Sequence, residues 1–255
     1  FVWFISKLKK KPYIITEHWT GYLAESNTKQ GFFQELIQRF VASRAKYICP
    51  VSLELKKSMV QLGINGNYKI VGNVVNTYLF CPSEKKDNIF TITHISTFKN
   101  RHKNINGILN VIKKISNNRL DFIFNIIGDG DLIKLKQKIN QLNITSNIIR
   151  TQGTRNPKQI AEILQQSNLY ISFSNFETFG IVMLEAIACG VPVISTNTGI
   201  VNELNLTDFA TIIPKNDEEA LYKAINFYLN TNREEDKQAM FNRVNQQFSM
   251  QNIAF

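Results

Sequence analysis

Apolar residues along the chain follow two different spacings, and from about residue 89 onward these spacings alternate regularly. Short runs such as "IFTITHIS" at 89–96 predict buried strands, and segments with an apolar residue every three or four positions, such as "NINGILNVIKKIS" at 104–116, predict amphipathic helices. Apolar strands that alternate with helices are typical of a parallel sheet covered on both faces. We therefore expect a doubly wound α/β fold.

The same two patterns can be followed from one end of the chain to the other. The predicted strands are 12–16, 47–50, 68–75, 89–96, 121–128, 147–153, 169–174, 191–196 and 209–214. The predicted helices are 29–46, 52–64, 104–116, 131–142, 157–167, a helix from 179 or 180 that Gly190 ends, 199–204, 217–230 and 233–248.

One segment interrupts the alternation. The stretch "NTYLFCPSEKKDN" at 76–88 combines turn-forming residues, a proline and a cluster of charges, which is typical of a linker. We therefore divide the chain into residues 1–82 and 83–255. The chain begins with Phe and stops at "QNIAF" without a helix stop signal, so we expect both ends to be cuts in a longer protein.

Composition narrows the class of protein. The 255 residues carry a net charge of +10, which favours acidic partners such as phosphorylated ligands or anionic lipid, although a solvated lysine-rich surface explains the excess equally well. The basic residues are dispersed and no recognition motif occurs, so nucleic acid is not expected as a partner. Three scattered cysteines favour a reducing compartment, and no apolar run approaches a membrane span.

Two acids stand out in "SNFETFGIVMLEAIACGVPVIS" at 174–195. Glu177 lies at the carboxyl end of a predicted strand, where ligands bind in such folds, and Gly180 opens the way to the start of the next helix. Glu185 is isolated among apolar residues about two turns along that helix, and a ribose diol suits such a carboxylate. The alternative is that Glu177 caps the helix and Glu185 pairs with a buried lysine or amide.

These residues resemble the donor-binding signature of the retaining glycosyltransferases of family four, which have the two-domain GT-B fold. The signature is two Glu separated by seven residues, with "FG" after the first and "EA" before a glycine and "PV" after the second, as found here from Glu177 to Val193. The stretches "ITEHWTGY", "FNIIGDGD" and "KIVGNVVN" resemble other parts of this family. The resemblance implies a GT-B fold in which 1–82 is the late part of the acceptor-side domain with the hinge, and 83–255 is the donor domain.

The resemblance also implies a role for individual residues. Glu177 would contact the donor sugar, with His18 near the reacting carbon, and Glu185 would bind the ribose. Lys103 would contact the diphosphate. Ser96 stands near the place of the family's arginine, so Arg101 or Lys99 would help Lys103 to neutralise the phosphates. Further expected donor-binding residues are Thr178, Phe179, Gly180, Gly128, Gly153 and Arg155, while Asn73 would shape the floor of the cleft.

The implied activity is transfer of a sugar from a UDP- or GDP-linked donor to a glycan or lipid-linked saccharide, with retention of configuration. No metal and no other cofactor are expected, because cationic groups and a helix dipole would stabilise the leaving diphosphate. The basic charge is compatible with a cytoplasmic location and peripheral contact with an anionic membrane at its inner face. The alternatives are a nucleotide-sugar epimerase of the same architecture, for which the histidines His18, His94 and His102 are few, and a non-catalytic nucleotide-binding module.

Overall fold

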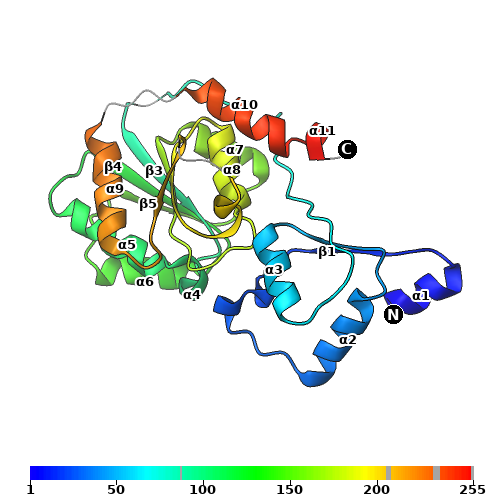
Figure 1. Ribbon diagram of the computed structural model, residues 1–255. Helices are drawn as coiled ribbons and strands as arrows, with labels where there is room; N and C mark the ends of the chain where they lie inside the picture. Colours follow the sequence, from blue (N-terminus) through cyan, green and yellow to red (C-terminus); the bar gives the residue numbers. More distant parts are fainter. Residues whose placement is uncertain (87, 205–207, 232–235, 254–255) are drawn as a thin grey trace. The chain divides into compact units, whose positions relative to one another are not determined.

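The computed structural model describes residues 1–86, 88–204, 208–231 and 236–253 (Figure 1). These residues form two compact units that do not follow chain order. The first unit contains residues 1–73, 176–180 and 198–204, and the second contains the other described residues. The chain therefore returns twice to the first unit after residue 74.

The helices and strands lie close to the predicted positions. The strands are β1 (Ile14–Glu17), β2 (Tyr47–Pro50), β3 (Phe90–Ile95), β4 (Phe122–Ile127), β5 (Ile149–Gln152), β6 (Leu169–Ser172), β7 (Val193–Thr196) and β8 (Ala210–Ile213). The helices are α1 (Val2–Lys9), α2 (Phe32–Ala42), α3 (Leu53–Gln61), α4 (Asn100–Lys103), α5 (Ile105–Ser116), α6 (Leu132–Gln141), α7 (Pro157–Gln165), α8 (Ile181–Ala188), α9 (Glu218–Asn230), α10 (Lys237–Phe248) and α11 (Met250–Ile253). Single 3-10 turns are η1 (Thr20–Tyr22), η2 (Ala24–Ser26) and η3 (Gly199–Asn202).

The second unit is built on a six-stranded sheet in the order β5-β4-β3-β6-β7-β8. All five strand pairs are parallel, which confirms the predicted α/β fold with a parallel sheet. The strand order reverses between β3 and β6, as it does in dinucleotide-binding sheets. In such sheets ligands bind outside the carboxyl ends of the strands at this switch point.

Helices cover the sheet on both faces, because right-handed crossovers that run in opposite directions from β3 place their helices on opposite sides. Helix α5 packs against α9, and α8 packs against both α7 and α10 (Figure 1). Phe122, Phe124 and Ile108 are among the buried side chains of the core between the sheet and these helices. Each large apolar side chain buried in this way contributes about 1.5–3 kcal/mol.

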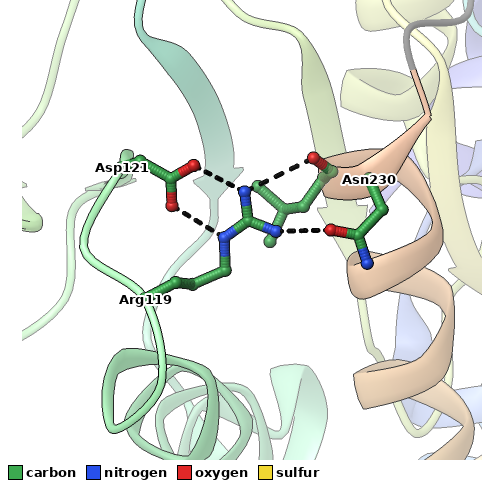
Figure 2. A network of polar contacts seen from close by, with 4 residues as sticks. Arg119, Asp121 and Asn230 are labelled. Carbon is green, nitrogen blue, oxygen red and sulfur yellow. Dashed lines mark hydrogen bonds and ion pairs between the residues drawn. The ribbon is translucent and has the colours of Figure 1, made fainter.

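A polar network closes the sheet at the amino end of β4. The guanidinium of Arg119 donates to both carboxylate oxygens of Asp121, at 2.7 and 2.6 Å, and to the side-chain oxygen of Asn230 at 2.8 Å (Figure 2). It also reaches the backbone carbonyl of Leu229, near the end of α9. The network therefore ties the turn before β4 to the carboxyl end of a helix, where a cation is favoured.

The first unit contains a two-stranded parallel sheet, β1 and β2, with α3 capped by the Ser52 hydroxyl. The prediction of a strand at 68–75 is wrong, because within the described residues this segment forms one isolated bridge, between Ile48 and Tyr68. Lys69 N donates to Ile48 O, but Pro50 has no N–H with which to continue the ladder.

Five helical segments among the described residues were not predicted from the sequence: α1, α4, α11 and the turns η1 and η2. The first residues of the predicted helix 233–248 lie outside the described residues, and α10 is described from Lys237. Among the described residues, no helix combines the length and apolarity that a membrane span requires.

Candidate functional site

The segment that follows β3 at the switch point is held by a chain of hydrogen bonds. His94 Nδ1 lies 2.8 Å from the carbonyl oxygen of Ile171 in β6, and His94 Nε2 lies 2.8 Å from Ser96 Oγ. A carbonyl oxygen only accepts, so Nδ1 carries the proton and Nε2 accepts from the hydroxyl. Ser96 Oγ in turn accepts from Phe98 N at 3.2 Å. The end of β3 is thereby fixed to β6.

The residues after Ser96 form a turn, and the loop after β4 can pack against this turn only because it contains glycines. Phe98 has a φ of 57°, an uncommon conformation for a bulky side chain that functional loops often contain. A Cβ on Gly128 would lie 1.6 Å from Ser96 O, and a Cβ on Gly130 would lie 2.5 Å from the Phe98 side chain. Both glycines of "GDG" therefore allow the loop after β4 to pack closely against the turn after β3.

Three predicted diphosphate ligands lie on or beside α4. Lys99 and Arg101 are exposed and Lys103, the last residue of α4, is half-buried. Asn175, which follows β6, donates from its backbone N to His102 O at 2.8 Å and from its side-chain Nδ2 to Arg101 O at 2.9 Å. The structure therefore joins the basic turn to the segment after β6, directly at the switch point.

Glu185 lies on α8, partly buried among apolar neighbours. Burial raises the pKa of its carboxyl to about 7, because the apolar surroundings penalise the charged form. No hydrogen bond or ion pair of this side chain was found among the described residues, so the alternative of a buried lysine partner has no support there. The carboxyl group can still accept or donate a hydrogen bond to a ligand.

Two predicted residues lie beyond β5. Gly153 follows the strand directly, and Leu132 lies 3.4 Å from the position of a Cβ there. Arg155 is exposed and makes local hydrogen bonds to the side chain of Gln152 and to the carbonyl of Thr154. The guanidinium is therefore held near the end of β5.

Four predicted residues lie on the segment that returns to the first unit. Glu177 and Phe179 are buried, while Thr178 and Gly180 are half-buried. Gly180 has a φ of +89°, and a Cβ placed there would meet nothing within 4 Å. Glycine is thus required by the backbone conformation and leaves open space beside it. The same segment is packed by Gly199, where a Cβ would lie 2.6 Å from Phe179 O.

The predicted His18 is exposed at the end of β1, in the first unit. The carboxylate of Glu17 accepts from the backbone N of both His18 and Trp19, each at 2.9 Å. The pKa of the neighbouring Tyr22 is raised to about 12 by burial and by the charge of Glu17. Glu17 therefore fixes the turn that carries His18, a role that sequence reasoning did not assign.

The first unit also contains a cavity of about 200 Å³ directly after this turn. Its polar lining includes Asn27, Thr28, Gln38 and the ion pair of Glu35 with Arg39. Side-chain amides and a carboxylate–guanidinium pair offer several donors and acceptors in one place. Such a lining suits a polyhydroxylated ligand.

The described part of the chain contains no group of three His, Cys, Asp or Glu side chains arranged to hold a metal ion. Of the predicted residues, the structure brings Ser96, Arg101, Lys103 and Gly128 to the switch-point edge of the second unit. His18 and the segment 176–180 belong to the first unit. Asn175 and His94 were missed as site residues, since no spacing in the sequence marks them.

The protein family described as "Glycosyl transferases group 1" matches residues 76–246 of the chain. The chain is 32% identical over 114 residues to N-acetyl-alpha-D-glucosaminyl L-malate synthase of Bacillus anthracis, covering 44% of this chain and 29% of that protein. It is 25% identical over 222 residues to an uncharacterized glycosyltransferase of Methanocaldococcus jannaschii, covering 84% of this chain and 59% of that protein. The chain thus spans less than two thirds of the length of each of these relatives.

Solved structures that cover nearly the whole chain include the following two. Sucrose-phosphate synthase of Thermosynechococcus elongatus has a TM-score of 0.81 at 18% identity, covering 99% of this chain and 68% of its own. Anabaena HepE in complex with UDP has a TM-score of 0.83 at 18% identity, covering 98% and 72%. Both are GT-B glycosyltransferases, so the predicted GT-B type of fold is confirmed.

Proposed function

Because the chain belongs to the family described as glycosyl transferases group 1, we propose that it transfers a sugar from a UDP- or GDP-linked donor to a glycan or lipid-linked saccharide. The observation that carries the proposal is the basic turn 99–103, fastened to β6 at the switch point of a parallel sheet. A nucleoside diphosphate is the kind of ligand that such a point in the fold accepts. HepE, a structural neighbour, was solved with UDP.

In this proposal the second unit binds the nucleotide. Lys103 and Arg101, with Lys99, neutralise the diphosphate, and Ser96 shapes the turn that carries them. Glu185 accepts hydrogen bonds from the ribose hydroxyls, and Gly153 and Arg155 pack against the base. Gly128 contributes by letting the turn after β3 take its conformation.

The segment 176–180 and His18 act on the sugar. Glu177 contacts the sugar hydroxyls and stabilises the positive character that develops at the reacting carbon. Backbone N–H groups near Thr178, Phe179 and Gly180 face the donor sugar, and the open space beside Gly180 supports a close approach. His18, held by Glu17, lies near the reacting carbon.

The finer points of the proposal are a family-four assignment, retention of configuration and independence from metal ions. In place of a metal, the cations of the turn stabilise the leaving diphosphate. The polar cavity after β1 is the proposed acceptor pocket, because its amides suit a saccharide. A cytoplasmic location at the inner membrane face fits a lipid-linked acceptor and the net charge of +10.

Titration calorimetry tests this proposal on the full-length protein with UDP, GDP and the bare nucleosides. The parent should bind one diphosphate more tightly than its nucleoside, and Lys103→Ala should weaken the diphosphate by about 1.5–3 kcal/mol while leaving the nucleoside unchanged. If Lys103→Ala weakened the affinity for both ligands equally, Lys103 would not contact the diphosphate.

A second assay separates a transferase from a non-catalytic module. The full-length protein is incubated with a panel of UDP- and GDP-sugars without acceptor, and slow donor hydrolysis is expected from a transferase. Binding without hydrolysis of any donor would favour a nucleotide-binding module, and conversion of one nucleotide sugar into its epimer would favour an epimerase.

A further inference from the structure

Helix α4 has only four residues, Asn100–Lys103, and ends at Asn104, whose φ of 47° turns the chain into α5. The last carbonyl groups of a helix have no partner inside it, and those of Arg101 and His102 are among them. A helix this short does not hold its shape by its own hydrogen bonds. The direction of its basic side chains therefore depends on what satisfies its carboxyl end.

Asn175 satisfies that end with two separate groups. Its backbone N–H donates to His102 O at 2.8 Å, and its side-chain Nδ2 donates to Arg101 O at 2.9 Å. The two bonds join the turn after β3 to the segment after β6, the two strands that flank the switch point. The backbone bond is available to any residue except proline, whereas the second bond needs a side-chain donor of this length.

The side-chain oxygen of Asn175 is less well placed than its Nδ2. Asn175 Oδ1 is buried and has no hydrogen-bond partner among the described residues. An unsatisfied buried acceptor is destabilising, so the side chain adds little net stability to the fold. Asn175 therefore contributes little to folding stability, and the main effect of its side chain is to hold the backbone of the basic turn in position.

We infer that Asn175 is a positioning residue of the nucleoside-diphosphate site, holding the 101–103 turn in the direction that phosphate binding requires. The inference rests on the proposed function. Asn175 itself contacts no phosphate, and it acts through the backbone that carries Arg101 and Lys103. Its removal should loosen the turn while the sheet and the helices stay intact.

Calorimetry and thermal unfolding of the full-length protein test this inference with Asn175→Ala. The alanine removes one hydrogen bond and one unsatisfied acceptor, so the melting temperature should move little. The affinity for the preferred diphosphate, UDP or GDP, should fall roughly threefold to tenfold, and the affinity for the bare nucleoside should stay the same.

Asn175→Asp sharpens the test, because it keeps the shape, replaces the donor with an acceptor and adds a negative charge beside the turn. It should weaken diphosphate binding more than Asn175→Ala does, and added salt should narrow the difference between them. The matched control is Asn226→Ala on α9, which removes a comparable 2.8 Å bond to the Tyr222 carbonyl. That variant should bind the diphosphate like the parent.

Each other outcome overturns the inference in a recognisable way. If Asn175→Ala lowers the melting temperature strongly and weakens both ligands, the residue is structural. If the parent prefers the diphosphate and Asn175→Ala keeps that preference in full, the side-chain bond does not position the turn. If the parent shows no preference for a diphosphate, the proposed function fails and the inference fails with it.

Discussion

The six-stranded sheet has an amino edge, where its strands begin, and a carboxyl edge, where they end. Polar side chains have opposite roles at these two edges. At the amino edge, Arg119 and Asp121 satisfy each other and join the end of α9 (Figure 2). At the carboxyl edge, Ser96 and Asn175 use their hydrogen bonds to shape the backbone of a basic turn. At the amino edge the side chains pair with each other, and at the carboxyl edge they shape the turn that, in the proposed function, presents Arg101 and Lys103 to the diphosphate.

A second network at the amino edge follows the same rule. Asn168, just before β6, accepts from Thr91 N and from the Lys85 ammonium, while its own backbone N donates to Thr91 O. By contrast, Thr97 Oγ1 at the carboxyl edge is buried with no partner among the described residues. Polar groups are thus more completely satisfied where the sheet needs only stability.

The largest expected effect comes from removing the charge of Glu177, which belongs to the first unit, with Glu177→Gln. If the carboxylate stabilises positive character in the transition state, kcat should fall roughly 10²-fold or more while the donor KM changes little. Steady-state kinetics of the full-length protein with its donor and acceptor measure both constants. The matched comparison is Glu185→Ala, which should mainly raise KM, as expected for uniform binding. A Glu177→Gln variant that raised KM alone would show that both acids only bind substrate.

The next effect separates stability from binding at Glu185. Its pKa is raised to about 7 by burial, so the folded protein holds this proton more tightly than the unfolded chain does. The ordinary pKa of a glutamate carboxyl is 4.5. Folding stability should therefore fall as the pH rises from 4.5 to about 7, and then level off. Glu185→Gln should remove this loss and be more stable than the parent at pH 8 by on the order of 2 kcal/mol. Urea unfolding at several pH values measures the difference.

Nucleotide affinity should depend on pH in the opposite direction. The ionised carboxyl accepts the ribose hydroxyls better than the protonated form does, so the parent's affinity for UDP or GDP should rise as the pH passes through about 7. The affinity of Glu185→Gln should lack this rise. A parent whose affinity is flat across this range would show that the ribose is bound elsewhere.

The sequence predicted the second unit well, because its strands are apolar runs and its helices have start signals such as Asn156 before Pro157, where the structure shows a cap. The basic residues of the turn were assigned only through the family resemblance, since spacing cannot reveal the hydrogen bonds that Asn175 makes to their backbone. The strand predicted at 68–75 failed for a related reason: its residues have strand propensity, but the partner that would pair with them has Pro50 in its ladder. Whether such a segment forms a strand depends on a pairing partner far away in the sequence, and a local pattern holds no information about that partner.

The smallest expected effect is a loss of stability without a loss of binding, from Arg119→Ala at the amino edge. The Arg119 side chain is 23% exposed and Asp121 is 65% exposed, so solvent screens the pair and the variant should lose about 1 kcal/mol of unfolding free energy. Lys114→Ala is the matched control, because the Lys114–Glu219 pair is half exposed on both sides and should contribute less to the free energy of unfolding than the Arg119 network does. Arg119 lowers the pKa of Asp121, so the difference between parent and variant should shrink as the pH falls through that lowered pKa and Asp121 takes up a proton. Affinity for the nucleoside diphosphate should be the same in all three proteins. If Arg119→Ala weakened the diphosphate as much as Lys103→Ala does, the two edges would be coupled and the division of roles between them would be wrong.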